Sequence, residues 1–335
     1  MSLPADHSPV APPKVGILLI NLGTPDAPEP AAVRRYLAEF LSDRRVVEIP
    51  RLAWLPILHG IILRTRPRKS AHAYAQVWGA DGSPLASITD RQARALQSRL
   101  GEDVLVDWAM RYGNPALAAV IDRMVEAGVT RILAAPLYPQ YCAATTASAM
   151  DAIFAALASR RRQPALRTLP PYYDDPIHLD ALAANLKRQL EVLDFKPDRL
   201  LLSFHGMPER TLTLGDPYHC HCQKTARLVG ERLDIATDIS FQSRFGRAKW
   251  LEPATDAMLA AYPARGVTKL AIAAPGFSAD CLETIEELGI RGREAFLGVG
   301  GTRFARLDCL NDSDEGMAML DALIRRELAG WWPPA

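Results

Sequence analysis

The feature that most constrains the fold is a set of three short motifs that occurs twice, in the same order, in the two halves of the chain. The pairs are INLGTP (20–25) and SFHGMP (203–208), RYG (111–113) and RFG (244–246), and GVTRILAAP (128–136) and GVTKLAIAAP (266–275). Each motif lies at or near the end of an apolar segment. The shared order therefore predicts an ancient duplication and two similar domains.

Apolar segments of strand length alternate with segments of helical character along the chain. Six strands are expected, at residues 15–23, 104–110, 131–137, 199–206, 237–243 and 269–276. Helices are expected at residues 30–41, 90–100, 115–127, 145–158, 178–193, 222–233, 251–261, 283–289 and 315–328. This alternation is typical of an α/β fold with parallel sheets flanked by helices. In such sheets ligands bind beyond the carboxyl ends of the strands, so we expect an active-site cleft between the two domains.

A chain of 335 residues is long enough for two domains. We expect a disordered leader at residues 1–13, an N-terminal domain at 14–165, a C-terminal domain at 166–310 and a C-terminal helix at 311–330 that packs back on the body. The leader has neither the charged region nor the apolar region of a signal peptide.

Composition excludes several classes of protein. The formal net charge is +1 and no basic block recurs, which argues against a nucleic-acid partner. The 5 cysteines do not form a disulfide framework in a chain of this length, so we expect reduced thiols and a cytoplasmic location. No apolar run reaches the roughly 18 residues of a membrane span.

Residues 200–210, LLLSFHGMPER, place a histidine where an apolar strand ends. An imidazole at the mouth of a strand can handle protons near neutral pH, although a packed loop histidine without chemistry is the alternative. The first half of the duplication distinguishes between these two interpretations, because it carries Leu22 where the second half carries His205. The fold can be built with an apolar residue at this position, which favours a catalytic role for His205.

A second candidate group follows the last predicted strand. Ser278 or Asp280 can cap a helix there. Its first turns carry Glu283, Glu286 and Glu287. Glu283 and Glu287 are four apart and share one helix face, where carboxylates can relay protons or hold a divalent cation. Acids also occur in a first turn simply because the helix dipole favours them. The corresponding first-half segment, QYCAATTAS, has no acid, so a site shared with His205 is favoured.

Two further segments have more than one interpretation. GDPYHCHCQKT at residues 215–225 invites a metal site, but its Cys-x-Cys spacing fits closed zinc sites poorly, and a helix-capping turn with incidental thiols is preferred. Residues 51–69, here named the lip, are apolar and end in a basic cluster. The lip is either a helix buried in the core or an exposed cover over the cleft. As a cover it would touch a flat ligand or a membrane, with Arg64, Arg66 and Arg68 facing carboxylates or lipid phosphates.

Taken together, these motifs make the sequence resemble the ferrochelatases, enzymes that insert ferrous iron into a porphyrin late in heme synthesis. The resemblance spans roughly residues 15–328. Its motifs are NLGTPD, the GSP turn at 82–84, RYG, YPQY at 138–141 followed by TT, SFHGMPER with GDPY, QSRFG followed by KWL, and LETIEEL. The resemblance implies two Rossmann-like domains with a porphyrin cleft between them.

The resemblance also implies roles for particular residues. His205 matches the catalytic histidine of the family and Glu283 its catalytic glutamate, and both are expected to contact the metal. Glu287 and Asp280 are expected along a proton or metal path. The positions expected to bind the porphyrin are Leu22, Ser83, Arg111, Tyr112, Trp250 and, on the lip, Arg68.

The chain departs from family patterns at two cysteines. Cys281 stands where many relatives have a histidine, so we expect no direct metal role there. Cys142 falls one residue before the position that matches a ligand of the two-iron, two-sulfur cluster of some relatives, and the terminal GWWPPA has no cysteine. We therefore expect no iron–sulfur cluster and no organic cofactor, with Fe(II) as a substrate.

The expected activity is insertion of Fe(II) into protoporphyrin IX to give protoheme, the last step of heme biosynthesis. Alternatives within the class are a chelatase for coproporphyrin and one that inserts cobalt into another tetrapyrrole. A non-enzymatic, two-lobed ligand-binding protein is the alternative from another class, and His205 and Glu283 argue against it. The apolar lip favours the less polar porphyrin. It is also compatible with peripheral contact at the inner membrane and with handover from the preceding heme-pathway oxidase.

Overall fold

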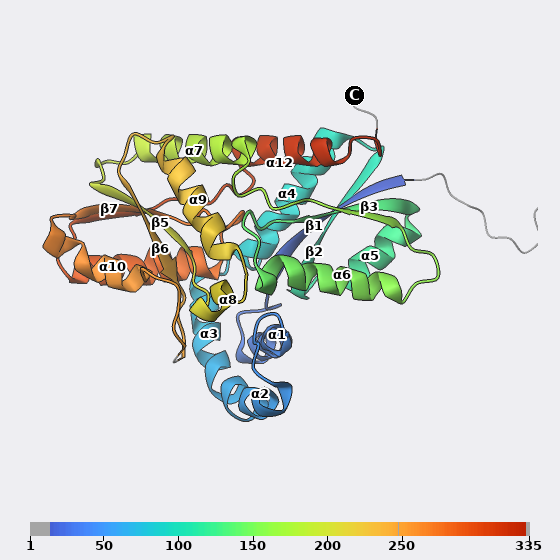
Figure 1. Cartoon of the computed structure of the whole chain (residues 1–335), viewed down its shortest axis with the longest axis horizontal. Helices are drawn as coiled ribbons and strands as arrows, with labels where there is room; N and C mark the ends of the chain where they lie inside the picture. Colours follow the sequence, from blue (N-terminus) through green and yellow to red (C-terminus); the bar gives the residue numbers. More distant parts are fainter. Residues whose placement is uncertain (1–13, 247, 333–335) are drawn as a thin grey trace, which may run out of the picture.

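Two four-stranded parallel sheets with equivalent strand orders form the framework of the chain (Figure 1). The computed structural model describes residues 14–246 and 248–332, so the leader expected at residues 1–13 lies outside the described residues. The first sheet has the order β2-β1-β3-β4, with β1 (Lys14–Thr24), β2 (Val104–Gly113), β3 (Val129–Pro136) and β4 (Ala165–Thr168). The second has the order β6-β5-β7-β8, with β5 (Arg199–His205), β6 (Thr237–Gln242), β7 (Lys269–Ala273) and β8 (Arg303–Arg306). The predicted α/β fold with two similar parallel-sheet domains is confirmed.

Helices cover the faces of both sheets. In the first half they are α1 (Pro30–Ser42), α2 (Arg51–Ile57), η1 (Leu58–Ile62), α3 (Leu63–Val77), α4 (Pro84–Leu100), α5 (Leu117–Glu126), η2 (Ala143–Ala147) and α6 (Ser148–Ala158). In the second half they are α7 (Pro176–Glu191), α8 (Glu209–Thr213), α9 (Tyr218–Gly230), α10 (Thr255–Ala261), η3 (Pro263–Arg265), η4 (Glu283–Gly292), α11 (Arg293–Gly298) and α12 (Asp314–Glu327). The segments η1, η2 and η4 are π-helical. Helices α7 and α12 run along one side of the molecule, and α1 to α3 project from the other (Figure 1).

The central strands explain why the sheets form. Strand β1 lies between β2 and β3, and Ile17 to Ile20 are fully buried. Ile17 and Leu19 pack into the core cluster that includes α4 and α12, whereas Leu18 and Ile20 pack into the cluster on the opposite face. A strand buried on both faces needs a continuous apolar run. The leucine run of β5 meets the same requirement in the second sheet.

The ends of the two domains differ from the predicted boundaries. Strand β4 pairs with β3, so the first sheet continues three residues past the boundary placed after residue 165, as far as Thr168. The C-terminal helix α12 packs against α4 and α7, and its Leu320 and Leu323 enter the core cluster of the first sheet. The last helix of the chain therefore completes the core of the first half.

Sequence patterns missed two of the four edge strands and misaligned one motif. Strands β4 and β8 have only four residues each, ALRT and RFAR, and carry no apolar run. The pairing register places Asn21 beside Met110 and Phe204 beside Phe241. Met110 and Phe241 therefore correspond. RYG ends strand β2, whereas RFG lies in the loop after β6, so the match between these two motifs is wrong by two residues.

The lip forms α2, η1 and the beginning of α3. No side chain of α2 is buried, and Leu52 is 94% exposed. Leu58 and Leu63 are buried against α1, but Ile57 and Ile61 on the same segment are exposed. The interpretation of the lip as a buried core helix is therefore wrong, because one face packs on α1 and the other remains apolar and uncovered. Within the described ranges, none of the helices is long and apolar enough to cross a membrane.

Candidate active site

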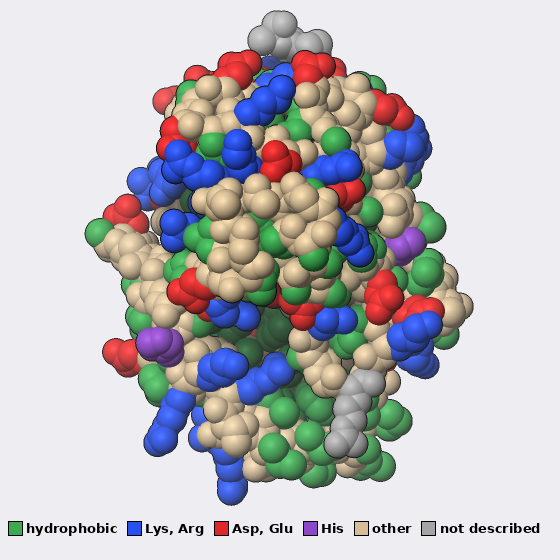
Figure 2. All heavy atoms as spheres, turned by 90° about the vertical axis from the view of Figure 1, so that its left-hand side faces the viewer, with side chains coloured by type: hydrophobic (Ala, Val, Ile, Leu, Met, Phe, Trp, Pro, Cys, Tyr) green, Lys and Arg blue, Asp and Glu red, His purple; other side chains and the backbone are tan. Residues whose placement is uncertain are grey.

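The carboxyl ends of the central strands face a hollow between the body and the projecting helices. Figure 2 shows this hollow with an apolar interior and with basic and acidic side chains around its mouth. His205 is the last residue of β5, and Leu22 lies near the end of β1. Both side chains are half-buried. The two positions that the duplication pairs are therefore at the expected ends of their sheets.

His205 is held by two hydrogen bonds. Its Nδ1 lies 2.7 Å from the carbonyl oxygen of Gly206, and the hydroxyl of Tyr218 donates to the His205 carbonyl at 3.0 Å. A carbonyl oxygen can only accept, so Nδ1 carries the ring proton in this arrangement. A neutral imidazole protonated at Nδ1 has its lone pair at Nε2. The local geometry thus presents Nε2 as a proton acceptor or a metal ligand.

Gly206 allows β5 to end tightly against its neighbours. A Cβ at this position would lie 2.4 Å from the carbonyl oxygen of Gln242 and 3.4 Å from the ring of Trp250. Only glycine accommodates so close an approach of backbone to backbone. Trp250 is 9% exposed, and its indole N–H donates to the carbonyl of Phe245 at 3.1 Å. Trp250 therefore lies next to the turn that carries His205, as expected for a pocket-lining residue.

The acids of η4 lie close to His205. The amide nitrogen of Gln242, which pairs with His205 across β5 and β6, donates to the Glu283 carbonyl at 3.2 Å. Burial raises the pKa of Glu287, and the negative charge of Glu283 raises it as well. Hydrogen bonding from Ser243 and the nearness of His205 act in the opposite direction. Glu287 therefore lies within electrostatic reach of both His205 and Glu283.

Two tyrosines of the first half face the same acids. Burial raises the pKa of Tyr36 on α1 and of Tyr74 on α3, and the charge of Glu283 raises both further. Helix α3 also packs directly against η4. Sequence reasoning missed Tyr36 and Tyr74, because a tyrosine on the inner face of an amphipathic helix is indistinguishable from an ordinary core residue. Both are buried aromatic side chains of the first half that lie near Glu283.

Asp280 is surrounded by partners of its own. Arg306 donates to its carboxylate at 2.8 Å, and the Thr284 hydroxyl and the Asn311 side chain each donate at 2.7 Å. The side chain is 5% exposed. This arrangement anchors the segment before η4 and leaves little capacity for a proton or a metal. Glu286 is similarly engaged, by Arg291 at 2.8 Å.

Arg111 and Tyr112 belong to a polar cluster centred on Asp43. One oxygen of Asp43 accepts hydrogen bonds from Arg111 at 2.5 Å, from the Tyr112 hydroxyl at 2.8 Å and from the Ser148 hydroxyl at 2.6 Å. Burial alone would raise the pKa of Asp43, but the hydrogen bonds from Ser148, the Arg45 N–H and Tyr112 and the charge of Arg111 lower it. Tyr112 is fully buried, so it supports Arg111 and does not line the hollow itself.

The remaining predicted porphyrin positions occupy different depths. Ser83 is buried and accepts a hydrogen bond from the Thr24 hydroxyl at 2.8 Å. Arg68 is exposed on α3. Its neighbour Arg66 lies over the ring of Phe245 at 5.0 Å, which joins the lip to the second half at the mouth of the hollow. Ser83 therefore lies beneath the surface, whereas the Arg68 side chain is exposed to solvent.

The histidines and cysteines of the GDPYHCHCQKT segment diverge from one another. His221 stacks on Tyr173 with ring centroids 3.6 Å apart, whereas His219 stacks on Phe241. Cys222 is buried and Cys220 is exposed. Among the described residues, no group of three or more histidine, cysteine or acidic side chains is arranged to hold a metal ion. The segment begins helix α9, which agrees with the capping interpretation.

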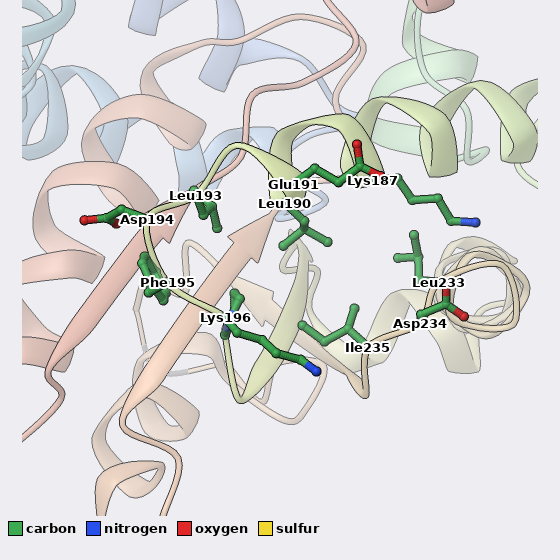
Figure 3. A pocket seen from close by; sticks show the side chains of 11 residues that line it. Lys187, Leu190, Glu191, Leu193, Asp194, Phe195, Lys196, Leu233, Asp234 and Ile235 are labelled. Carbon is green, nitrogen blue, oxygen red and sulfur yellow. The ribbon is translucent and has the colours of Figure 1, made fainter.

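A second hollow lies at the other end of the C-terminal sheet. It has a volume of about 500 Å³ and is lined by the end of α7, the following loop and the residues before β6 (Figure 3). Lys187, Lys196 and Asp234 border it. It lies near the amino ends of β5 and β6, away from His205, and contains none of the predicted site residues. It is therefore separate from the candidate active site.

The arrangement of two open parallel sheets is the fold of solved chelatase structures. SirB from Bacillus subtilis, solved with Fe3+, has a TM-score of 0.55 with the chain at 13% identity, and the match covers 95% of this chain and 97% of that one. CbiX, described as the terminal enzyme for biosynthesis of siroheme in denitrifying bacteria, has a TM-score of 0.50 at 14% identity, covering 93% of this chain and 98% of that one. At these identities the likeness shows the fold.

The chain belongs to the ferrochelatase family, whose model matches residues 14–328. It is 51% identical to the ferrochelatase of Rhizobium meliloti (strain 1021), over 99% of this chain and 100% of that protein. It is 53% identical to the ferrochelatase of Methylibium petroleiphilum, over 95% of this chain and 89% of that protein. The chain is therefore a metal chelatase of heme biosynthesis, and its substrates are a porphyrin and iron. The expected ferrochelatase activity is confirmed, whereas the choice of porphyrin and the roles of single residues stay predictions.

Proposed function

We propose that His205 accepts the pyrrole protons that must leave the porphyrin as ferrous iron enters. The single observation that supports this role best is the bond between Nδ1 of His205 and the Gly206 carbonyl, because it leaves Nε2 with a free lone pair. Imidazole changes its charge near neutral pH, which suits a base that must take up and release protons in every turnover.

Glu283 and Glu287 would serve the same reaction from the π-helical segment η4. Carboxylates can carry the released protons outward or deliver iron to the ring, because carboxylate and imidazole both bind Fe(II). In either case we assign Glu283, whose charge also acts on the buried Tyr36 and Tyr74, to the reacting centre, and Glu287 to the position behind it. Asp280 would act as the anchor of this segment.

The two halves would hold the ring between them. A porphyrin distorted from planarity directs its nitrogen lone pairs out of the plane, and strain of order 1 to 5 kcal/mol can be drawn from binding energy. His205 from the second half and Leu22 from the first half are suited to opposite walls, with Trp250 beside His205. The exposed Arg68 would meet a carboxylate of the substrate.

Protoporphyrin IX is the proposed porphyrin, and protoheme the product. Support comes from the apolar interior of the hollow (Figure 2) and from the uncovered apolar side chains of the lip. Coproporphyrin carries more carboxylates, which would have to be buried there without partners. Comparing kcat/KM for the two porphyrins tests this preference, and a higher value for coproporphyrin would reverse it.

The same lip suits a peripheral contact with an anionic membrane surface. Leu52 and Ile61 are 94% and 57% exposed, and Arg64, Arg66 and Arg68 follow on α3. Apolar side chains next to basic ones are typical of segments that lie on lipid headgroups. A cytoplasmic enzyme bound there could receive its porphyrin directly from the preceding oxidase. Sedimentation with anionic vesicles, with Leu52→Ser and Ile61→Ser as matched variants, tests this contact.

The proposal includes no organic cofactor and no iron–sulfur cluster. Incubating the purified protein with ferrous iron and protoporphyrin, and following the Soret band for heme, tests the activity directly. Loss of heme formation with retained porphyrin binding in His205→Ala would support the assigned base. Full turnover by that variant would remove His205 from the mechanism. An absorption band that depends on iron but not on porphyrin would contradict the absence of a cluster.

A further inference from the structure

Ser243, the first residue after β6, has an unusual backbone conformation. Its φ is +64°, and in the described part of the chain Asn311 is the other non-glycine residue with a positive φ. Residues with a side chain adopt this left-handed region at a cost of roughly 1 kcal/mol or more, so surrounding contacts must stabilise it. The contacts of Ser243 therefore indicate what this conformation is for.

Both hydrogen-bond donors of Ser243 go to one carboxylate. Its backbone N–H donates to one oxygen of Glu287 at 2.8 Å, and its hydroxyl donates to the other at 2.6 Å. Hydrogen bonds to an ionised acceptor are stronger than those between neutral groups. Within the described residues Glu287 forms one ion pair, with Arg291 at 3.9 Å, so the shorter contacts that fix this side chain come from Ser243.

The residue before Ser243 reaches the other acid-bearing turn. Gln242 donates to the Glu283 carbonyl at 3.2 Å and accepts from the buried Ser203 hydroxyl at 2.8 Å. Gln242 also pairs with His205 in the sheet. The end of β6 therefore connects the strand of His205 to both acid-bearing turns of η4, through Gln242 at Glu283 and through Ser243 at Glu287.

We propose that Ser243 is a positioning residue for metal insertion, which acts by fixing the Glu287 carboxylate against the end of β6, the strand that pairs with the strand of His205. The left-handed conformation is what allows the N–H and the hydroxyl of one residue to reach the same carboxylate. This inference rests on the proposed role of Glu287.

The variant that tests it is Ser243→Gly. Glycine keeps the N–H and adopts a positive φ readily, so only the hydroxyl contact is lost and the fold is not strained. We expect kcat for iron insertion to fall about tenfold, the KM for porphyrin to stay within about twofold, and Tm to be equal or higher. A residue that served only the fold would show the opposite, a lower Tm with kcat retained. Asn311→Gly is the matched control, because Asn311 is the other described non-glycine residue with a positive φ. This substitution removes the side-chain contact of Asn311 to Asp280, so we expect a lower Tm.

A double-mutant cycle identifies the residue through which Ser243 acts. In a Glu287→Ala background, Ser243→Gly should cause no further loss of kcat, because its target is already absent. Additive losses would show that Ser243 acts elsewhere and would overturn the inference. If Glu287→Ala is impaired but Ser243→Gly alone keeps full kcat, the inference fails while the role of Glu287 stands. Full kcat in Glu287→Ala alone would remove that role and this inference together.

Discussion

Strands β1 and β5 occupy the same place in their sheets, but β1 carries Leu22 where β5 carries His205. The third strands also correspond, and each is followed by a π-helical segment. In the first half this segment reads AATTA and contains no acid. In the second half it begins with Glu283 and continues with Glu287. The same backbone pattern therefore occurs once without and once with the groups that handle protons and metal.

The difference separates what the fold needs from what the reaction needs. A buried cysteine precedes the π-helical segment in both halves, and burial raises the pKa of Cys142 to about 12 and that of Cys281 well above its usual value. These thiols stay protonated and pack, so the feature that the halves share is structural. The first half instead supplies the buried aromatic side chains of Tyr36 and Tyr74, which lie near Glu283. We therefore assign the catalytic residues to the second half, and residues that shape the cleft to the first half.

The largest effect is expected from exchanging the corresponding residues of the central strands. His205→Leu places at the end of β5 the residue that β1 already accommodates, so the protein should fold with a Tm close to that of the wild type. Heme formation should fall by about 10² to 10⁴, the contribution of a positioned general base. The reciprocal Leu22→His should alter mainly the KM for porphyrin. Initial rates of heme formation and thermal denaturation measure the two effects.

An unfolded His205→Leu protein would contradict the equivalence of the halves, because it would show that β5 needs histidine for packing. Retained turnover would contradict the assignment of catalysis to the second half.

The second prediction compares substitutions of two neighbouring acids of the second half, Glu283 and Asp280. Glu283→Gln should lower kcat by about 10² with little change in Tm, because Glu283 is half-buried, forms no ion pair among the described residues and is the proposed catalytic acid. Asp280→Asn should instead lower the free energy of unfolding by about 3 kcal/mol, because it removes the charge of a buried carboxylate that pairs with the half-buried Arg306. Urea unfolding and heme formation, measured on both variants, separate the two roles. Equal losses of kcat at unchanged stability would place Asp280 in the reaction path.

A smaller effect is expected from the polar cluster of the first half. Asp43→Asn should destabilise the protein by about 2 kcal/mol at pH 7, because Arg111, Tyr112 and Ser148 lose the negative charge of their common acceptor. The pKa of Asp43 is lowered in the folded protein, so its contribution is present above the usual aspartate pKa and is lost as pH falls through the lowered value. The gap between variant and wild type should therefore close in acid.

Heme formation at pH 7 serves as the control for this variant. We expect a loss of less than about tenfold, since Arg111 shifts but no proposed proton carrier is touched. A loss of heme formation as large as that expected for Glu283→Gln would show that the first half also has a catalytic role.

The sequence predicted the parts of the molecule that depend on local pattern. The buried strands are continuous apolar runs, and His205 stands out because its counterpart is Leu22. The acids of η4 stand out because AATTA has none. Each of these signals comes from comparing one half of the chain with the other. Strands β4 and β8 were missed, because short half-exposed edge strands carry no such pattern.

Contacts between segments that are far apart in the sequence could not be predicted from it either. Tyr36 and Glu283 are brought together only by the packing of the two halves, and Ser243 meets Glu287 through a turn that no local propensity favours. Asp43 reaches Arg111 across most of the first domain. The opposite roles of Asp280 and Glu283, three residues apart, follow from which of them meets Arg306.

The smallest effect on activity is expected from a second histidine, one that belongs to the shared framework. His178 lies on α7 beside Tyr172 and is 1% exposed. Burial lowers its pKa to about 4, and the nearby Asp175 only partly offsets this. The folded protein therefore keeps His178 neutral, whereas the unfolded chain takes up a proton near the usual histidine pKa. Heme formation at neutral pH should be unchanged in His178→Gln.

Stability should respond to pH through this residue. As pH falls from about 6.5 toward about 4, the unfolded state gains a proton that the folded state excludes, and the wild type loses roughly 3 kcal/mol. His178→Gln cannot take up that proton, so its free energy of unfolding should fall less over the same interval, and below about pH 4 the two curves should run parallel. Urea unfolding at several pH values measures the difference. Parallel curves over the whole range would mean that His178 is protonated in the folded protein, which its burial without a charged partner in contact does not allow. In that case burial would no longer distinguish His178 from His205 as the histidine that takes part in the reaction.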